Sequence, residues 1–153
     1  MPTRRPSKHS RILLVDDEQD ILDILSRTLE MAGYDVNLAS NGRMALEMVA
    51  AREYDLIITN IRMPVMNGVA FYRMLCNSFP HMASRVILCT GDIAYLTTQP
   101  SPGNAGVPVI LKPFQLRNVL EIVAWQLSSE HDRVPALPLA PNLENLLPSA
   151  TQP

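Results

Sequence analysis

Several features that mark specialised classes of protein are scarce or missing in this chain of 153 residues. Only two cysteines occur, Cys76 and Cys89, and they form neither a CxxC nor a CxH pattern, so we expect two buried thiols in a reducing compartment. The 15 acidic and 13 basic residues nearly balance, which gives no electrostatic reason to expect nucleic acid or an anionic membrane as partner. No apolar run approaches the roughly 20 residues that span a bilayer, and no signal-peptide pattern follows the basic N-terminus. These absences predict a soluble cytoplasmic protein.

Short apolar segments instead alternate with helical patterns along most of the chain. Hydrophobic residues make up 47% of the sequence, which favours a packed core. Branched apolar runs predict buried strands at 12–15, 36–38, 56–58, 86–88 and 109–111. Apolar residues at helical spacing predict helices at about 21–29, 45–49, 69–79 and 116–127. The alternation predicts an α/β fold, doubly wound around a five-stranded parallel sheet of flavodoxin-like order 2-1-3-4-5.

Local signals refine the helices of this predicted fold. Ser40 or Asn41 is the expected N-cap of the second helix, and Pro80 should end the third. The expected buried face of the third helix contains Val69, Tyr72, Leu75, Cys76 and Phe79. Prolines and glycines crowd the segment 92–108, so we expect a fourth helix that is shortened or irregular.

The two ends of the chain differ in composition from the predicted domain. Residues 1–10 are expected to form a mobile basic arm, residues 11–129 the domain, and residues 130–153 a Pro-rich tail. Leucines 143, 146 and 147 of the tail could form a small docking element for a partner or for the domain itself. The three histidines fall in expected tails or in a turn, which favours surface positions over ligand or catalytic roles.

Polar residues follow the predicted strands at the ends where a parallel sheet of this kind binds its ligand. Asp16 and Asp17 follow the first strand, Asn60 ends the third, Thr90 the fourth, and Lys112 comes after the fifth. Two adjacent acids repel one another unless a cation lies between them, and Mg²⁺ prefers carboxylate oxygens. The alternative is an exposed acidic turn at the start of the next helix, where negative charge is favoured.

Taken together, the acidic pair, the Asn60-Ile61-Arg62-Met63-Pro64 turn, Thr90-Gly91 and Lys112-Pro113 resemble the receiver domain of response regulators. The resemblance covers about residues 10–129. It implies that Asp17 is a direct Mg²⁺ ligand, that Asp16 acts through water, and that the backbone carbonyl of Arg62 is the third protein ligand. It also implies that Thr90 and Lys112 bind the phosphoryl group. The bond that corresponds to Lys112–Pro113 is often cis in that family, which fixes the approach of the lysine.

Two residues depart from the pattern of that family. Asn60 stands where receivers carry the aspartate that accepts the phosphoryl group, and an amide oxygen is an uncharged, poor nucleophile. The amide oxygen of Asn60 can still point at the metal, so Asn60 is also an expected metal-site residue. The loss of one negative charge should weaken Mg²⁺ binding and leave Lys112 to pair with Asp16 or Asp17. Val109 stands where active receivers usually carry the Tyr or Phe of the conformational switch. The resemblance therefore implies a phosphorylation relay that is impaired.

The expected function is that of a stand-alone receiver in a two-component phosphorelay, a signalling and interaction module rather than an enzyme. It would be either a natural pseudo-receiver or a receiver with an engineered Asp→Asn change. The expected partner is a histidine kinase or phosphotransfer domain that meets exposed apolar residues of the first helix near Ile24 and Leu25. One alternative is a scaffold that binds through the last helix and the Pro-rich tail. A phosphohydrolase is disfavoured, because the Asp-x-Asp-x-Thr pattern is absent.

Overall fold

A computed structural model describes residues 10–92 and 106–128. The N-terminal arm, the expected fourth helix between 92 and 108, and the Pro-rich tail lie wholly or mostly outside these ranges. Ser10, at the end of the expected arm, is buried, and its carbonyl accepts a hydrogen bond from the backbone N–H of Asp35 at 2.9 Å. The elements are β1 Arg11–Val15, α1 Gln19–Met31, β2 Asp35–Ala39, α2 Gly42–Ala51, β3 Leu56–Asn60, α3 Gly68–Ser78, α4 Pro80–Ala83, β4 Val86–Thr90, β5 Val109–Leu111 and α6 Leu116–Gln126.

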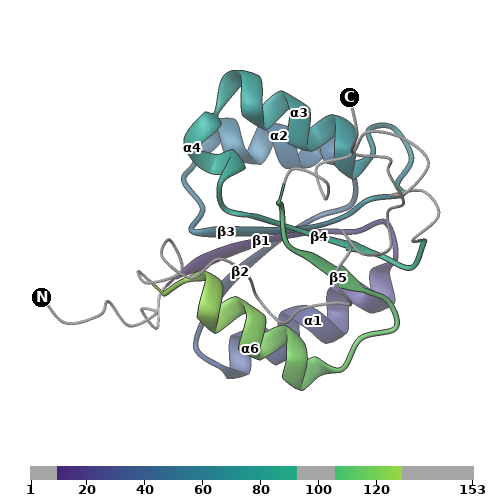
Figure 1. Ribbon diagram of the computed structural model, residues 1–153, viewed down its shortest axis with the longest axis vertical. Helices are drawn as coiled ribbons and strands as arrows, with labels where there is room; N and C mark the ends of the chain where they lie inside the picture. Colours follow the sequence, from purple (N-terminus) through teal and green to yellow (C-terminus); the bar gives the residue numbers. More distant parts are fainter. Residues whose placement is uncertain (1–9, 93–105, 129–153) are drawn as a thin grey trace, which may run out of the picture.

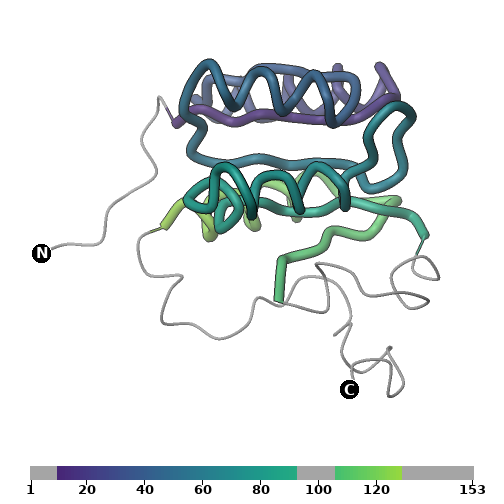
Figure 2. Tube along the Cα trace, turned by 90° about the horizontal axis from the view of Figure 1, so that it is seen from above, coloured from purple at the N-terminus to yellow at the C-terminus, as the bar shows by residue number. Residues whose placement is uncertain are grey.

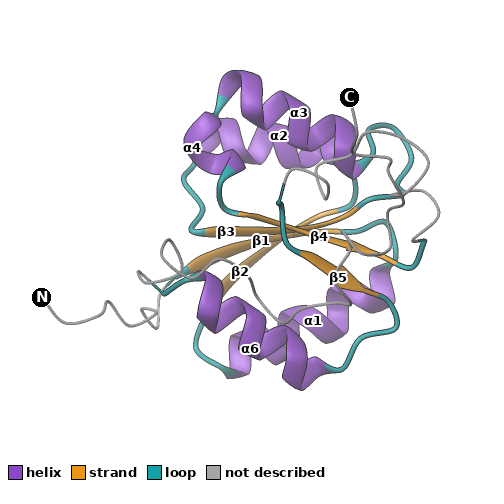
Figure 3. Ribbon diagram, viewed as in Figure 1, coloured by secondary structure: helices purple, strands orange, loops and turns teal. Residues whose placement is uncertain are grey.

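Five parallel strands form one sheet in the order β2-β1-β3-β4-β5, which confirms the predicted topology. Helices α2, α3 and α4 cover one face of the sheet, and α1 and α6 cover the other (Figures 1 and 3). The trace in Figure 2, seen from above, shows the strands running side by side. The register pairs Val15 with Thr59 and Asn60 with Cys89. The carboxyl ends of the central strands therefore meet at one edge of the sheet.

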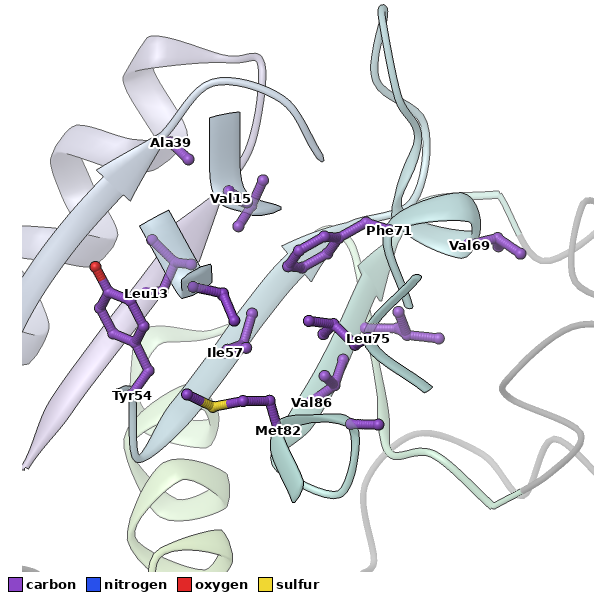
Figure 4. Close-up of a cluster of buried hydrophobic side chains, with 14 of the residues drawn as sticks. Leu13, Val15, Ala39, Tyr54, Ile57, Val69, Phe71, Leu75, Met82 and Val86 are labelled. Carbon is purple, nitrogen blue, oxygen red and sulfur yellow. The ribbon is translucent and has the colours of Figure 1, made fainter. Parts of the chain in front are cut away.

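Two apolar cores lie on the two faces of the sheet because the strands are buried on both sides. One core joins inward residues of the sheet to α2, α3 and α4, and includes the fully buried Tyr54, Phe71 and Met82 (Figure 4). The other core packs α1 and α6 against the opposite side chains of the same strands. The cores hold the strand ends rigidly, so polar side chains placed there are held in defined positions.

The face that α3 buries agrees with the predicted one except at two residues. Val69 and Leu75 are buried, and Tyr72 and Phe79 are partly buried against the same core, as predicted. Cys76 is exposed, and Phe71, which the pattern did not assign, is buried. Adjacent helical residues are about 100° apart, so the residue after Leu75 is turned away from the stripe that contains Phe71 and Leu75. The prediction that both thiols are buried was therefore wrong for Cys76 and confirmed for Cys89.

Asparagine side chains begin two helices on the same side of the sheet. The Asn41 side chain accepts a hydrogen bond from the backbone N–H of Met44 at 2.9 Å, which makes Asn41 the N-cap of α2. Asn67 caps α3 in the same way. Pro80 follows the end of α3, as predicted, but it also begins the short helix α4, which the sequence reading missed. Proline is favoured at the first position of a helix because a backbone N–H there has no acceptor within the helix, so its absence in proline costs no hydrogen bond.

Candidate functional site

The polar residues singled out in the sequence come together at the carboxyl edge of the sheet. The Lys112 ammonium lies 3.0 Å from Asp16 Oδ2 and 3.2 Å from Glu18 Oε1. Lys112 follows β5 and the two acids follow β1, so the ion pairs join two separated strands across one edge. The Lys112–Pro113 peptide bond is cis, as the resemblance implied. Asp16 or Asp17 was the predicted partner of Lys112. The structure pairs Lys112 with Asp16, and its second partner is Glu18.

Asn60 lies at the end of β3 with only 8% of its surface exposed. Its Nδ2 donates to the backbone carbonyl of Arg62 at 2.9 Å and to Asp17 Oδ1 at 3.4 Å. These acceptors belong to the two residues that the resemblance assigns to direct Mg²⁺ ligation. The structure thus brings Asp17 and the Arg62 carbonyl together around the side-chain amide of Asn60.

Burial decides the electrostatics of the pair between Asp16 and Lys112. Burial raises the pKa of Asp16 and outweighs the lowering by the Glu18 backbone N–H, which donates at 2.9 Å, and by Lys112. For Lys112, burial acts to lower the pKa, but the contact with Asp16 raises it on balance. Both pKa values are thus raised, that of Asp16 by burial and that of Lys112 by its interactions with Asp16, Cys89 and Glu18 together. Desolvation therefore dominates for the acid, and the ion pair dominates for the lysine.

Thr90 ends β4 and is buried, and its hydroxyl oxygen accepts a hydrogen bond from the backbone N–H of Asp92 at 3.0 Å. The Asp92 carboxylate in turn lies 2.7 Å from the guanidinium of Arg62. This ion pair joins the loop after β3 to the loop after β4. Sequence reasoning missed both Asp92 and Glu18 as parts of the site. The only signal was their position two residues after the strand-end residues Thr90 and Asp16.

Gly68 allows the close approach of α3 to the end of β3. A Cβ atom at Gly68 would collide with the backbone oxygen of Asn60 and lie 2.9 Å from Ile61 Cα. The Gly68 N–H donates to the Ile61 carbonyl at 2.8 Å. Both neighbours are backbone atoms that cannot swing away, so residue 68 needs the absence of a side chain.

The residues at this edge, as they are arranged, do not fit a divalent cation. Mg²⁺ needs oxygen atoms directed at one point, whereas the NH₂ group of Asn60 points at the Arg62 carbonyl and at Asp17. Within 10–92 and 106–128, no three His, Cys, Asp or Glu side chains come together as a possible metal site.

The remaining predicted positions divide into buried and exposed residues. Val109, at the expected switch position, is buried in β5 opposite Leu88. Ile24 of α1 is 46% exposed, in agreement with a surface role. Leu25 is only 4% exposed and packs into the core beneath α1 and α6, so its expected place on the exposed surface was wrong. It follows Ile24 by one residue and so lies about 100° around the helix, on the inner side.

Comparison with known proteins identifies the family. The model of the response regulator receiver domain matches residues 12–124. The chain belongs to this family. The receiver protein CpdR of Brucella abortus (strain 2308) is 33% identical over 110 residues, which are 72% of this chain and 90% of CpdR. Two other curated relatives are longer proteins, of which the chain spans 26% and 24%.

Solved receiver structures share the fold of this chain. A CheY-like receiver from Methanospirillum hungatei JF-1 is 32% identical with a TM-score of 0.70, covering 78% of this chain and 94% of the other. TrrA of Thermotoga maritima, solved in complex with Mg²⁺ and BeF, is 28% identical with a TM-score of 0.67, covering 76% and 98%. Receivers are mainly signalling modules of two-component systems; in general they bind Mg²⁺ and interact with histidine kinases and phosphotransfer proteins. Among the described residues, no helix has the length and apolar character of a membrane span.

Proposed function

We propose that this receiver works in a two-component pathway by binding its partners, without accepting a phosphoryl group at residue 60. The observation that carries the proposal is the buried amide of Asn60 at the centre of the acidic edge, hydrogen bonded to the Arg62 carbonyl. Phosphoryl transfer to a receiver requires a carboxylate oxygen that attacks phosphorus in line. An amide oxygen carries no formal charge and is a poor nucleophile, so the acyl phosphate does not form.

The rest of the site keeps its residues but loses part of its charge. Asp16, Asp17 and Lys112 are present, and the third carboxylate is absent. We expect this receiver to bind Mg²⁺ more weakly than receivers that have aspartate at the acceptor position, because hard cations are held by carboxylate charge. Val109 lacks the ring of a switch aromatic, so the conformational response to phosphorylation is also expected to be absent.

Labelling with a small phosphodonor such as acetyl phosphate in Mg²⁺ tests the proposal. The wild-type chain is expected to show no phosphoryl adduct by intact mass spectrometry, and Asn60→Asp should gain one. Asn118→Asp, which makes the same chemical change on an exposed residue of α6, should gain none. A wild-type chain that is labelled as strongly as Asn60→Asp would refute the proposal.

The proposed partner surface lies on α1 around Ile24, which receives a histidine kinase or phosphotransfer domain. Ile24 is 46% exposed, and Leu25 supports the helix from beneath. We expect binding to the cognate kinase to persist without phosphotransfer and to be lost in Ile24→Asp. Met31, at the end of the same helix and 88% exposed, offers a matched control as Met31→Asp. A pull-down in which the wild-type chain fails to retain the kinase would contradict this assignment.

Other parts of the proposal concern the organisation of the chain. We propose a cytoplasmic module made of a basic arm, the receiver over residues 11–129 and a Pro-rich tail, with no catalytic turnover of its own. Asn60 would be a natural feature of a pseudo-receiver or an engineered replacement of aspartate, and the genomic codon for residue 60 distinguishes these. Unchanged kinase binding after deletion of residues 131–153 would remove the tail from any scaffold role.

A further inference from the structure

Four acidic side chains at this edge, those of Asp16, Asp17, Glu18 and Asp92, each have a hydrogen-bond donor from the chain itself. Lys112 serves Asp16 and Glu18, Arg62 pairs with Asp92, and the Asn60 amide donates to Asp17. From this pattern we propose that the NH₂ group of Asn60 takes the place of the divalent cation. Its two hydrogens, which carry partial positive charge, join Asp17 to the Arg62 carbonyl. The inference rests on the proposed function, because it takes residue 60 as the altered acceptor position. The site is then complete without metal.

The chemistry of an amide decides which of its ends points inward. Both neighbours of Nδ2, Asp17 Oδ1 and the Arg62 carbonyl, are acceptors. An amide nitrogen carries two hydrogens and can donate to both, whereas an amide oxygen turned toward them would meet two acceptors without a proton between them. A cation would need that unfavourable rotation before Asn60 could ligate it. The hydrogen-bonded arrangement therefore opposes metal binding in addition to the missing charge.

The backbone around Asn60 prevents the amide from withdrawing. Asn60 is paired with Cys89 in the sheet, and the N–H of Ile61 donates to the Cys89 carbonyl at 3.0 Å. Gly68, at the start of α3, lies so close to the backbone carbonyl oxygen of Asn60 that a Cβ atom there would collide with it. The only freedom left to the side chain is rotation about its own bonds, and its hydrogen bonds oppose that rotation.

Charge balance supports the same assignment. With aspartate at residue 60, four carboxylates would face Lys112, those of Asp16, Asp17, Glu18 and residue 60; with Asn60 there are three. Here Lys112 is engaged by Asp16 and Glu18 at 3.0 and 3.2 Å, which leaves Asp17 to the amide and, because it is exposed, to water. The neutral amide avoids the repulsion that a fourth carboxylate would create.

Binding of Mn²⁺ and Mg²⁺ tests the inference without any phosphodonor. In ¹⁵N-labelled full-length protein, Mn²⁺ broadens NMR signals close to its binding site. We expect the Asp17, Asn60 and Arg62 backbone signals and the Asn60 side-chain NH₂ signals of the wild type to stay sharp at Mn²⁺ concentrations that erase the backbone signals in Asn60→Asp. Asn118→Asp reports non-specific binding and should behave as the wild type.

Thermal unfolding gives a second readout. Millimolar Mg²⁺ should leave the wild-type midpoint unchanged and raise that of Asn60→Asp by about 4 °C or more, the size expected when ligand exceeds Kd roughly tenfold. Asn60→Leu keeps a similar size but removes the donor, so its midpoint should fall and Mg²⁺ should not restore it.

Selective broadening around residues 17 and 60 in the wild type, or a midpoint that rises with Mg²⁺ as much as in Asn60→Asp, overturns the inference. An Asn60→Leu midpoint equal to the wild-type value overturns it as well. If Asn60→Asp does not fold, the Mn²⁺ and Mg²⁺ titrations of the wild type alone still test whether its site binds a divalent cation. Phosphoryl labelling of the wild type would defeat the proposed function and is measured separately from these metal titrations.

Discussion

Removal of the Lys112 ammonium should destabilise the domain far more than removal of an exposed cation. In Lys112→Met the Asp16 carboxylate, whose side chain is 6% exposed, loses its closest cation, at 3.0 Å. Loss of one partner of a fully buried ion pair costs about 3–5 kcal/mol. The 18% exposure of the Lys112 side chain and the 62% exposure of Glu18 give water some access, so we expect a loss of about 2 kcal/mol in the free energy of unfolding.

Chemical denaturation of the wild type and Lys112→Met at neutral pH measures this loss. Arg11→Met is the matched control, because Arg11 lies 3.4 Å from Asp35 with side chains 38% and 54% exposed. Exposed pairs contribute little, so the control should lose less than about 0.5 kcal/mol. Equal stability of Lys112→Met and the wild type would refute the view that burial makes the Asp16–Lys112 pair important.

The pH dependence provides an independent check on the same pair. Burial raises the pKa of Asp16 in the folded state, so the folded domain holds this proton more tightly than the unfolded chain. The contribution of Asp16 to stability therefore declines as pH rises from its unfolded pKa to its folded pKa. Without Lys112 the folded pKa rises further, so the deficit of Lys112→Met should shrink on acidification from neutral pH. A deficit that grows on acidification would contradict this account.

Three further predictions concern backbone geometry and thiol reactivity. Gly68→Ala places a methyl group against the Asn60 carbonyl and should cost about 2 kcal/mol or more, seen as an earlier urea midpoint. Val65 is 75% exposed with φ of 71°, a conformation that suits asparagine better than a β-branched residue, so Val65→Asn should raise the free energy of unfolding by about 1 kcal/mol; a decrease would contradict the assigned strain. Exposed Cys76 should react with iodoacetamide in the native state. Cys89, whose pKa burial raises to about 12, should react only after unfolding, and native labelling of Cys89 in the mass spectrum would argue against its burial.

Sequence patterns predicted the sheet well because fully apolar strands have few alternative placements. The runs at 12–15, 56–58 and 86–88 can bury both faces only in the middle of a parallel sheet covered by helices. The order of strands then follows from the connections between them. The strand ends brought Asp16, Asn60 and Lys112 together, in agreement with the cluster that the motifs predicted.

Sequence patterns failed where the rotation of a helix or the geometry of a loop decided the outcome. Cys76 was assigned from an apolar pattern that leaves the orientation of a helix uncertain by one residue, and one residue is a turn of about 100°. Leu25 was placed on the exposed surface by the family resemblance, although its spacing from Leu22 and Leu29 fits the buried face where it lies. Glu18 and Asp92 reach their partners through loop conformations, and no periodicity encodes those. The left-handed backbone of Val65 was equally hidden, because valine gives no signal for positive φ.

The loop from β3 to α3 is held by contacts with two other segments, the loop after β4 and the start of α2. Arg62 ties it to the loop after β4, and the Met66 carbonyl accepts a hydrogen bond from the N–H of Gly42 at 3.0 Å. The N–H of Gly68 closes the loop onto the Ile61 carbonyl. A chimaera that receives this loop alone would therefore need matching residues from α2 and from the segment after β4. Transplantation of the three segments as a set is the design that preserves their mutual anchoring.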